Sequence, residues 1–186
     1  MRALVVILVT PALLAGCGGG SGTQAASTPA GRVSTTSSQA TPVAAPPNCP
    51  TAHLRVTLGE ADGAAGSVYR PLIFNNTGSQ ACRLRGFPGV SYVAGDDGHQ
   101  VGSAATMSGT RGGEVLVEPG AAARAMVQFV VVQNFDPAVC RPTPVRGLRV
   151  YPPGDTAALF VPLDGATGCA GNPPGPQLSV QTITAS

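Results

Sequence analysis

The stretch AAARAMVQFVVVQ at residues 121–133 is the most apolar part of the chain beyond residue 15. Alanine favours a helix, but Val127, Phe129 and the valines at 130–132 are β-branched or aromatic residues, which pack better on a sheet. Only Gly120 precedes the run, so no strong helix-capping side chain stands at its start. We therefore predict a strand at the centre of a β-sheet.

Segments in which apolar and polar residues alternate lie on both sides of this strand. HLRVTL at 53–58, for example, places Leu54, Val56 and Leu58 on one face, as in a half-buried strand. Turn signals such as NNTGS at 75–79 and GDDG at 95–98 separate these segments. The other expected strands lie at 68–76, 81–87, 114–120, 145–151, 157–163 and 177–183, and in the two halves of 89–101.

Many short strands separated by turns predict an all-β domain, an antiparallel immunoglobulin-like β-sandwich. Pro71 and Pro162 fall inside two of the expected strands. Because proline cannot donate a hydrogen bond to a neighbouring strand, we expect sheet edges or bulges at both positions. FVVVQNF at 129–135 is expected as a buried core strand rather than an exposed binding strand.

The four cysteines beyond residue 48 are even in number, which in an exported protein predicts two disulfides with three possible pairings. We favour the sequential pairing, Cys49–Cys82 and Cys140–Cys169, because it closes two separate loops of similar size. No Cys-x-x-Cys pair is present to begin a four-thiolate metal site. We expect neither a metal nor a cofactor.

The N-terminus has the features of an export signal. ALVVILVTPALLA at residues 3–15 follows Arg2 and is too short for a membrane-spanning helix, which needs about 20 residues. The order Leu14-Ala15-Gly16-Cys17 resembles the lipobox of bacterial lipoproteins. That resemblance implies a signal peptide at 1–16, cleavage before Cys17 and a diacylglyceryl group on its thiol, with the new amine a further acylation site. The expected location is the extracytoplasmic face of the cell membrane.

Residues 17–48 have the composition of a tether. From Gly18 to Pro47 there is no acidic residue and a single basic one, Arg32, among Ser, Thr, Pro, Gly and Ala. Such a segment buries too little apolar surface to offset the entropy of ordering, so we predict a disordered linker before a folded domain at 49–186.

The charge balance excludes one class of partner. All eleven basic residues are arginines, and removal of the signal peptide leaves ten against nine acidic residues. No basic patch with interleaved aromatic residues occurs, so we do not expect a nucleic-acid-binding protein.

Several short motifs resemble a known family. They are Asn75-Asn76 before Cys82, Gly86-Phe87-Pro88 after it, and Pro119-Gly120 leading into the long strand. Together they resemble an actinobacterial lipoprotein family, domain of unknown function 4232, over most of residues 49–184. The resemblance implies a secreted β-sandwich on a lipid anchor and implies no activity.

Candidate catalytic residues are few. His99 with Asp96 or Asp97 offers a base and an acid, and Ser91, Ser103 and Ser108 are the nearest hydroxyls in sequence. No Gly-x-Ser-x-Gly motif accompanies them, and Asp-Gly is itself a hairpin signal, so we expect a solvated hairpin tip. His53 is expected on the polar face of the first strand. Glu60, Glu114 and Glu118 fit no glycosidase pattern, and the Asp96-Asp97 run lacks the repeated ligands of a calcium loop.

These observations favour a non-enzymatic binding module that contacts its partner through sandwich loops or an edge strand. The preferred contact is GSAATMSGTRGG at 102–113, which is long and poorly patterned. Beyond the membrane itself, the expected partners are a cell-wall component or an envelope protein. Two alternatives remain: a cell-wall hydrolase or transferase using His99 and nearby carboxylates, and a carrier of an apolar ligand in a pocket of the sandwich.

Overall fold

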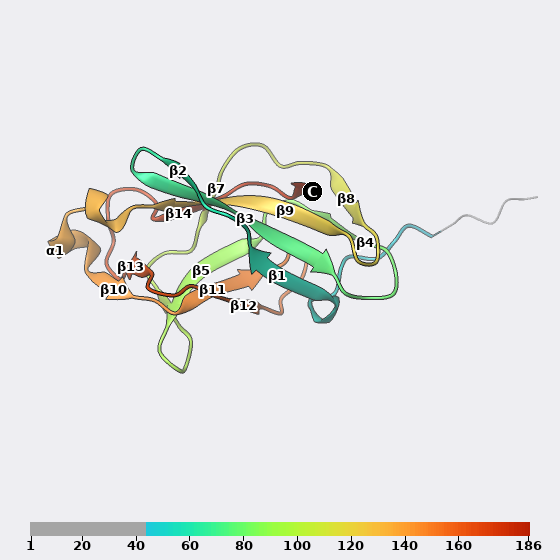
Figure 1. The fold of residues 1–186 in the computed structure, drawn as a ribbon, viewed down its shortest axis with the longest axis horizontal. Helices are drawn as coiled ribbons and strands as arrows, with labels where there is room; N and C mark the ends of the chain where they lie inside the picture. The colour runs from blue at the N-terminus through green and yellow to red at the C-terminus, as the bar shows by residue number, and fades with distance from the viewer. Residues whose placement is uncertain (1–43) are drawn as a thin grey trace, which may run out of the picture. The chain divides into compact units, whose positions relative to one another are not determined.

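The computed structural model describes residues 44–186. The lipobox residues Leu14, Ala15, Gly16 and Cys17 and nearly all of the linker lie outside this part of the chain, so their predictions stay predictions. The described residues contain fifteen strands, two short 3-10 helices and one four-residue α-helix (Figure 1).

The larger sheet contains most of the apolar stretch at 121–133. Its strand order is β1-β3-β9-β14-β7, with β2 paired to the far end of β3 and β15 to β9. All pairs are antiparallel except β14 with β7. The strands are Leu54–Leu58 (β1), Asp62–Ala64 (β2), Ser67–Asn76 (β3), Thr106–Met107 (β7), Ala122–Val130 (β9), Leu178–Val180 (β14) and Thr184–Ala185 (β15).

The second sheet has the order β12-β11-β5-β6. Its strands are Gly89–Ala94 (β5), His99–Val101 (β6), Gly147–Tyr151 (β11) and Leu159–Pro162 (β12). Two further pairs complete the fold: Cys82–Arg85 (β4) with Glu114–Val117 (β8), and Pro142–Pro144 (β10) with Thr167–Cys169 (β13). In Figure 1, β10, β13 and the helix α1 (Pro137–Cys140) lie at one end of the sandwich, and β4 and β8 at the other.

Alternation places one face of the long strands β3 and β9 in the core. On β3, Leu72 and Phe74 are fully buried, and on β9 Ala123, Ala125 and Val127 face the same side. The second sheet contributes apolar residues from β5, β11 and β12, namely Val90, Tyr92, Leu148, Val150 and Val161. The prediction of an all-β sandwich with two disulfides is confirmed.

The central strand is shorter than predicted. The register of β9 against β3 ends at Val130, and the chain then turns into a 3-10 helix at Val132–Asn134. Residues 129–132 are half-buried, so the expectation of a fully buried strand over 129–135 is wrong. The reason is that these residues line an open groove rather than the closed core.

The two prolines behave differently. Pro162 lies in β12, an edge strand, as predicted. Pro71 lies in β3, which has partners on both sides, so of the two predicted alternatives the edge does not hold there. Three residues at 59–61 lie opposite two at 70–71, which is the irregularity of a bulge. The Pro71 carbonyl accepts from Gly59 N–H at 2.8 Å, where β1 has ended and β2 has not begun. Since the N and O atoms of a residue in an antiparallel strand point to the same neighbour, the missing donor faces this gap.

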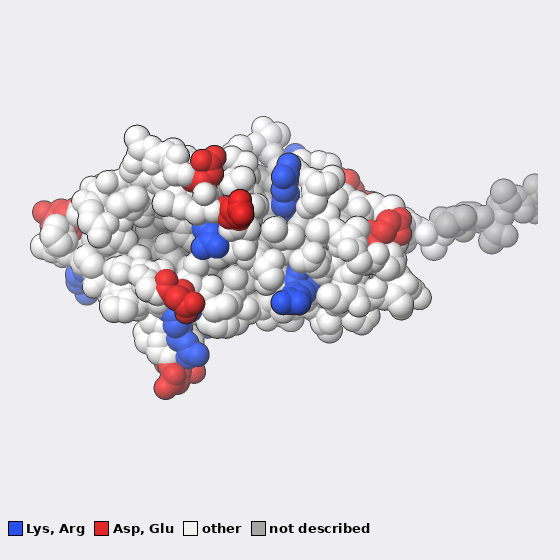
Figure 2. All heavy atoms as spheres, in the orientation of Figure 1, with Lys and Arg blue, Asp and Glu red and all other residues white. Residues whose placement is uncertain are grey.

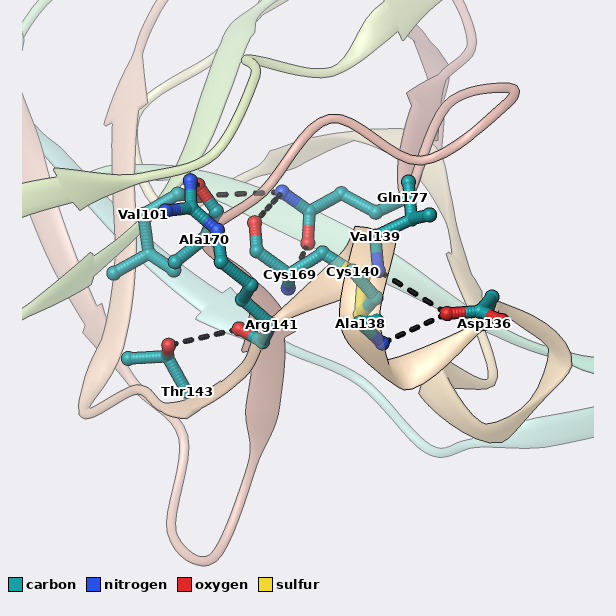
Figure 3. Close-up of a disulfide and its surroundings, with 10 residues drawn as sticks. All are labelled: Val101, Asp136, Ala138, Val139, Cys140, Arg141, Thr143, Cys169, Ala170 and Gln177. Atoms are coloured by element: carbon teal, nitrogen blue, oxygen red, sulfur yellow. Dashed lines mark hydrogen bonds between the residues drawn. A yellow bond between two sulfur atoms is a disulfide. The ribbon is translucent and has the colours of Figure 1, made fainter.

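The disulfides are Cys49–Cys82 and Cys140–Cys169, with Cα–Cα distances of 4.8 and 4.7 Å. These are the two pairs of the sequential connectivity. The second bond attaches α1 to β13 (Figure 3). Asp136 caps α1 by accepting from the N–H groups of Ala138 and Val139, and Arg141 ends it with a positive φ of 52°.

Among residues 44–186, no helix is long and apolar enough to cross a membrane.

Candidate binding groove

A groove of about 350 Å³ opens between the two sheets near the end that carries α1. Its walls come from β3, β5 and β9, from the turn that follows β9, and from the connection between β12 and β13. The lining residues are Val68, Arg70, Tyr92, Phe129, Val130, Val131, Val132, Gln133, Leu163, Gly165, Ala166 and Thr167.

The strand register explains why space opens here. Val68 and Arg70 continue the inner face of β3 beyond Leu72, and Val68 pairs with Phe129 of β9. Gly165 and Ala166 also line the groove, and because glycine has no side chain and alanine only a methyl group, they leave the space unfilled. The apolar side chains of Val68 and Phe129 therefore remain partly exposed and form walls of the groove.

Tyr92 forms the inner wall of the groove. Its side chain is only 4% exposed, and its ring lies 6.3 Å from that of Phe129, centroid to centroid, at an angle of 50°. Gly168 of β13 lies against it: a Cβ there would come within 2.9 Å of Tyr92 Cδ2. The Tyr92 hydroxyl has no hydrogen-bond partner among residues 44–186. Burial raises the pKa of Tyr92 to about 12, so the hydroxyl keeps its proton.

Arg70 supplies the positive charge of the groove. Its Nε donates to the carbonyl of Gly59 at 3.0 Å, which fixes the side chain beside the β1–β2 connection. No carboxylate of residues 44–186 lies within ion-pair distance of its guanidinium. The remaining N–H donors of Arg70 are therefore available to a ligand.

At the other end of the sandwich, the motifs that suggested a family have structural roles. Asn76 is buried, donates from Nδ2 to the carbonyls of Gln80 (2.8 Å) and Val117 (2.9 Å), and accepts from Gly78 N–H (2.9 Å). Gly86 and Gly120 take positive φ angles of 98° and 77° in the turns after β4 and β8.

The model of the family described as Domain of unknown function (DUF4232) matches residues 49–184. The chain belongs to this family.

The match confirms the resemblance to domain of unknown function 4232. No curated protein and no solved structure matched the chain.

The residues weighed as catalytic candidates in this DUF4232 domain lie on a solvated hairpin, as expected. His99 Nδ1 lies 2.8 Å from Asp97 Oδ1, with side-chain exposures of 56% and 73%. The hydrogen bonds from His99 lower the pKa of Asp97. Arg146 lies 3.3 Å from Asp96 and also donates to the Gly95 carbonyl. These contacts stabilise the turn.

The nearby serines do not complete a triad. Ser91 is buried, whereas Ser103 and Ser108 are exposed. Within residues 44–186, none of the three hydroxyls forms a hydrogen bond with His99, so the structure brings together an acid and a base but no nucleophile.

The remaining polar candidates are dispersed. Glu114 forms an exposed ion pair with Arg83 at 3.0 Å, while Glu60 and Glu118 are exposed. His53 is exposed beside a smaller cavity of about 280 Å³ near Cys82. In the described part of the chain, no three His, Cys, Asp or Glu residues cluster as metal ligands. On the face seen in Figure 2, charged side chains of both signs are few, and most of the surface is uncharged.

The stretch 102–113 is less irregular than predicted. Thr106–Met107 forms β7, an edge strand parallel to β14, and Ser108 N–H donates to the Val180 carbonyl at 2.9 Å. Gly112 N–H donates to Thr182 Oγ1 at 3.0 Å. Met107 remains 70% exposed, so this stretch offers an edge strand rather than a free loop.

Sequence reasoning missed the groove residues, although one signal was present. Arg70 lies in phase with Leu72 and Phe74, so an arginine occupies a position on the apolar face of its strand. A charge on the face that packs in the core calls for an explanation, which the groove supplies.

Proposed function

We propose that this chain is a lipid-anchored lipoprotein of an actinobacterial cell envelope, a non-enzymatic binding module displayed outside the cytoplasmic membrane. The observation that carries the proposal is the pairing of the cysteines. Both disulfides lie within the folded domain and use four of the five cysteines, so Cys17 has no cysteine partner left in the chain. Its place in Leu14-Ala15-Gly16-Cys17 gives the fifth thiol a role in acylation.

The disulfides also support the proposed compartment. All four cysteines are at most 3% exposed, and such buried structural disulfides form and persist in oxidising, extracytoplasmic environments. Two or more acyl chains on Cys17 give stable anchoring, because each buried methylene contributes about 0.8 kcal/mol.

The groove between the sheets supports a binding role. A concave, mostly apolar site with a few polar groups is the usual form of a small-ligand site, at about 300–1,000 Å³. The groove lies near the α1 end, whereas the described chain begins at the other end, where Cys49 N–H donates to the Arg83 carbonyl of β4. The groove therefore lies at the opposite end of the domain from the start of the described residues.

The anchor is tested by comparing the wild type with Cys17→Ser in an actinobacterial host fed an alkyne-tagged palmitate. The wild type should be labelled, sediment with membranes and yield an N-terminal peptide that begins at acylated Cys17. Cys17→Ser should lose the label and the cleavage, whereas Ser21→Ala, four residues away, should behave as the wild type. An unlabelled wild-type protein would overturn the proposal.

A further inference from the structure

The groove has few polar groups. Arg70 is the only charged residue among those that line it, and it has no acidic partner in the described chain. A guanidinium on the inner face of a sandwich loses part of its hydration, so an anion that pairs with it is favoured. This charge selects for a negatively charged group.

Because Arg70 is the one positive charge among the lining residues, a ligand with a single negative charge is favoured. The planar fork of an arginine matches the two oxygens of a carboxylate in a bidentate hydrogen bond. A phosphate monoester carries up to two negative charges, and the lining offers no second cation to balance the other. A carboxylate therefore fits this site better than a phosphate.

The rest of the ligand should be apolar. Val68, Phe129 and Leu163 form hydrocarbon walls on both sides of the groove. Its volume of about 350 Å³ equals roughly a dozen waters at about 30 Å³ each, and a methylene is similar in size to a water. A chain of about ten carbons would fill it.

The Tyr92 hydroxyl is the second observation that points to a ligand. Tyr92 lines the groove, and its hydroxyl forms no hydrogen bond with residues 44–186; since Arg83 Nε alone is a buried polar side-chain atom without a partner in this part of the chain, the hydroxyl is reached by solvent from the groove. A hydroxyl that opens into an apolar groove can donate a hydrogen bond to a polar atom of the ligand.

We propose that the groove binds a medium-chain acyl carboxylate, with the chain between Val68, Phe129 and Leu163 and the carboxylate on Arg70. This inference rests on the proposed binding role and names the ligand class of that site.

The test uses the native, acylated protein in membrane vesicles and a decanoate probe with a diazirine at the end of its chain. Irradiation should label residues 129–133 or 163–167, and free decanoate should compete. Decanol, which has the same chain without the charge, should need at least a tenfold higher concentration. Decyl phosphate should also compete less well than decanoate.

Matched variants test the contribution of the Arg70 charge and that of the apolar cavity one at a time. Arg70→Gln should weaken competition by decanoate at least tenfold and leave decanol unchanged, because it removes only the charge. Arg124→Gln removes an arginine from the exposed face of the same sheet and should have no effect. Ala166→Trp, which fills the groove, should abolish labelling, and the melting temperature of each variant verifies folding.

The outcomes on the wild type decide the inference without any variant. Labelling outside the groove, or equal competition by decanol and decanoate, overturns it, and stronger competition by decyl phosphate replaces the carboxylate by a phosphate. The acylation of Cys17 is measured by mass spectrometry in the same sample. If an acylated chain binds no decanoate, the ligand inference fails and the proposed anchor stands. If an unacylated chain binds decanoate, the proposed anchor fails and the ligand inference stands.

Discussion

Asp155 and Thr51, 104 residues apart in the sequence, are joined by two hydrogen bonds: Asp155 Oδ2 accepts from the backbone N–H of Thr51 at 2.9 Å and from its hydroxyl at 2.7 Å. The other carboxylate oxygen accepts from the N–H groups of Thr156 and Ala157. This carboxylate connects the 3-10 turn at Thr51–His53, next to the first disulfide, with the loop between β11 and β12.

The first prediction concerns acid stability. The hydrogen bonds from Thr51 and from the backbone of Ala157 hold the pKa of Asp155 far below its ordinary value. A depressed pKa stabilises the folded state above the ordinary value, near pH 4, and this stability is lost as the pH falls below it. Asp155→Asn should therefore lower the melting temperature at pH 7 and flatten its decline between about pH 4 and pH 2.

Asp164→Asn is the matched control, because Asp164 is exposed. Thermal unfolding at several pH values measures both variants. An Asp155→Asn curve parallel to that of the wild type over the acid range would show that this carboxylate does not control acid stability.

The second prediction concerns Asn76. Its replacement by alanine would leave the carbonyl of Val117 and the N–H of Gly78 without their partners, at a cost of about 3 kcal/mol in the free energy of unfolding. Asn75→Ala, which loses only one long contact of 3.5 Å to the Arg55 carbonyl, should cost less than about 0.5 kcal/mol. Denaturant unfolding with the disulfides intact makes the comparison, and equal losses would contradict it.

Whether a strand could be predicted from the sequence depends on whether its own residues carry a hydrophobic pattern. β1, β3 and β9 were predictable because buried and less buried positions alternate along them, and β5 because it is short and rich in apolar and aromatic residues. β2, β10 and β13 were not, since segments such as Asp62–Ala64 and Pro142–Pro144 have no apolar pattern and become strands through pairing with their neighbours. The groove depends on a register in which Val68 lies opposite Phe129, and composition alone does not determine that pairing.

The third prediction concerns the disulfides. Cys49–Cys82 and Cys140–Cys169 close loops with sequence separations of 33 and 29 residues. By the loop-entropy relation, loss of either bond should cost about 3.5–4 kcal/mol. The double alanine variants of the two pairs should therefore unfold at similar denaturant concentrations, well below that of the wild type. A difference of more than about 2 kcal/mol between them would show that native contacts, rather than loop entropy, decide the outcome.

The fourth prediction concerns the His99 hairpin. If this protein is a binding module, purified wild type and His99→Ala should be equally inactive on peptidoglycan and on a panel of esters. The physical reason is that His99 contacts Asp97 on an exposed tip, with no serine hydroxyl in hydrogen-bonding contact among the described residues. An activity that His99→Ala abolishes would establish the hydrolase alternative.

The fifth prediction uses two glycines that share a backbone conformation but not an environment. Gly102 and Gly109 have φ angles of 68° and 81°, so an alanine at either position costs about 1–2 kcal/mol in backbone strain. At Gly109 nothing lies within 4 Å of the added Cβ, whereas at Gly102 the Cβ would lie 2.1 Å from the Cys169 carbonyl oxygen and 2.3 Å from Gln177 Nε2.

The contacts at Gly102 belong to a buried bridge. Gln177 accepts from Cys169 N–H at 2.7 Å and donates to the carbonyls of Val101 and Cys169, which connects β6 with the second disulfide (Figure 3). Gly102→Ala should displace Gln177 and cost at least about 2 kcal/mol more than Gly109→Ala, because a buried amide then loses its partners. Denaturant unfolding of both variants measures the difference, and equal stabilities would mean that the bridge contributes nothing beyond the backbone strain.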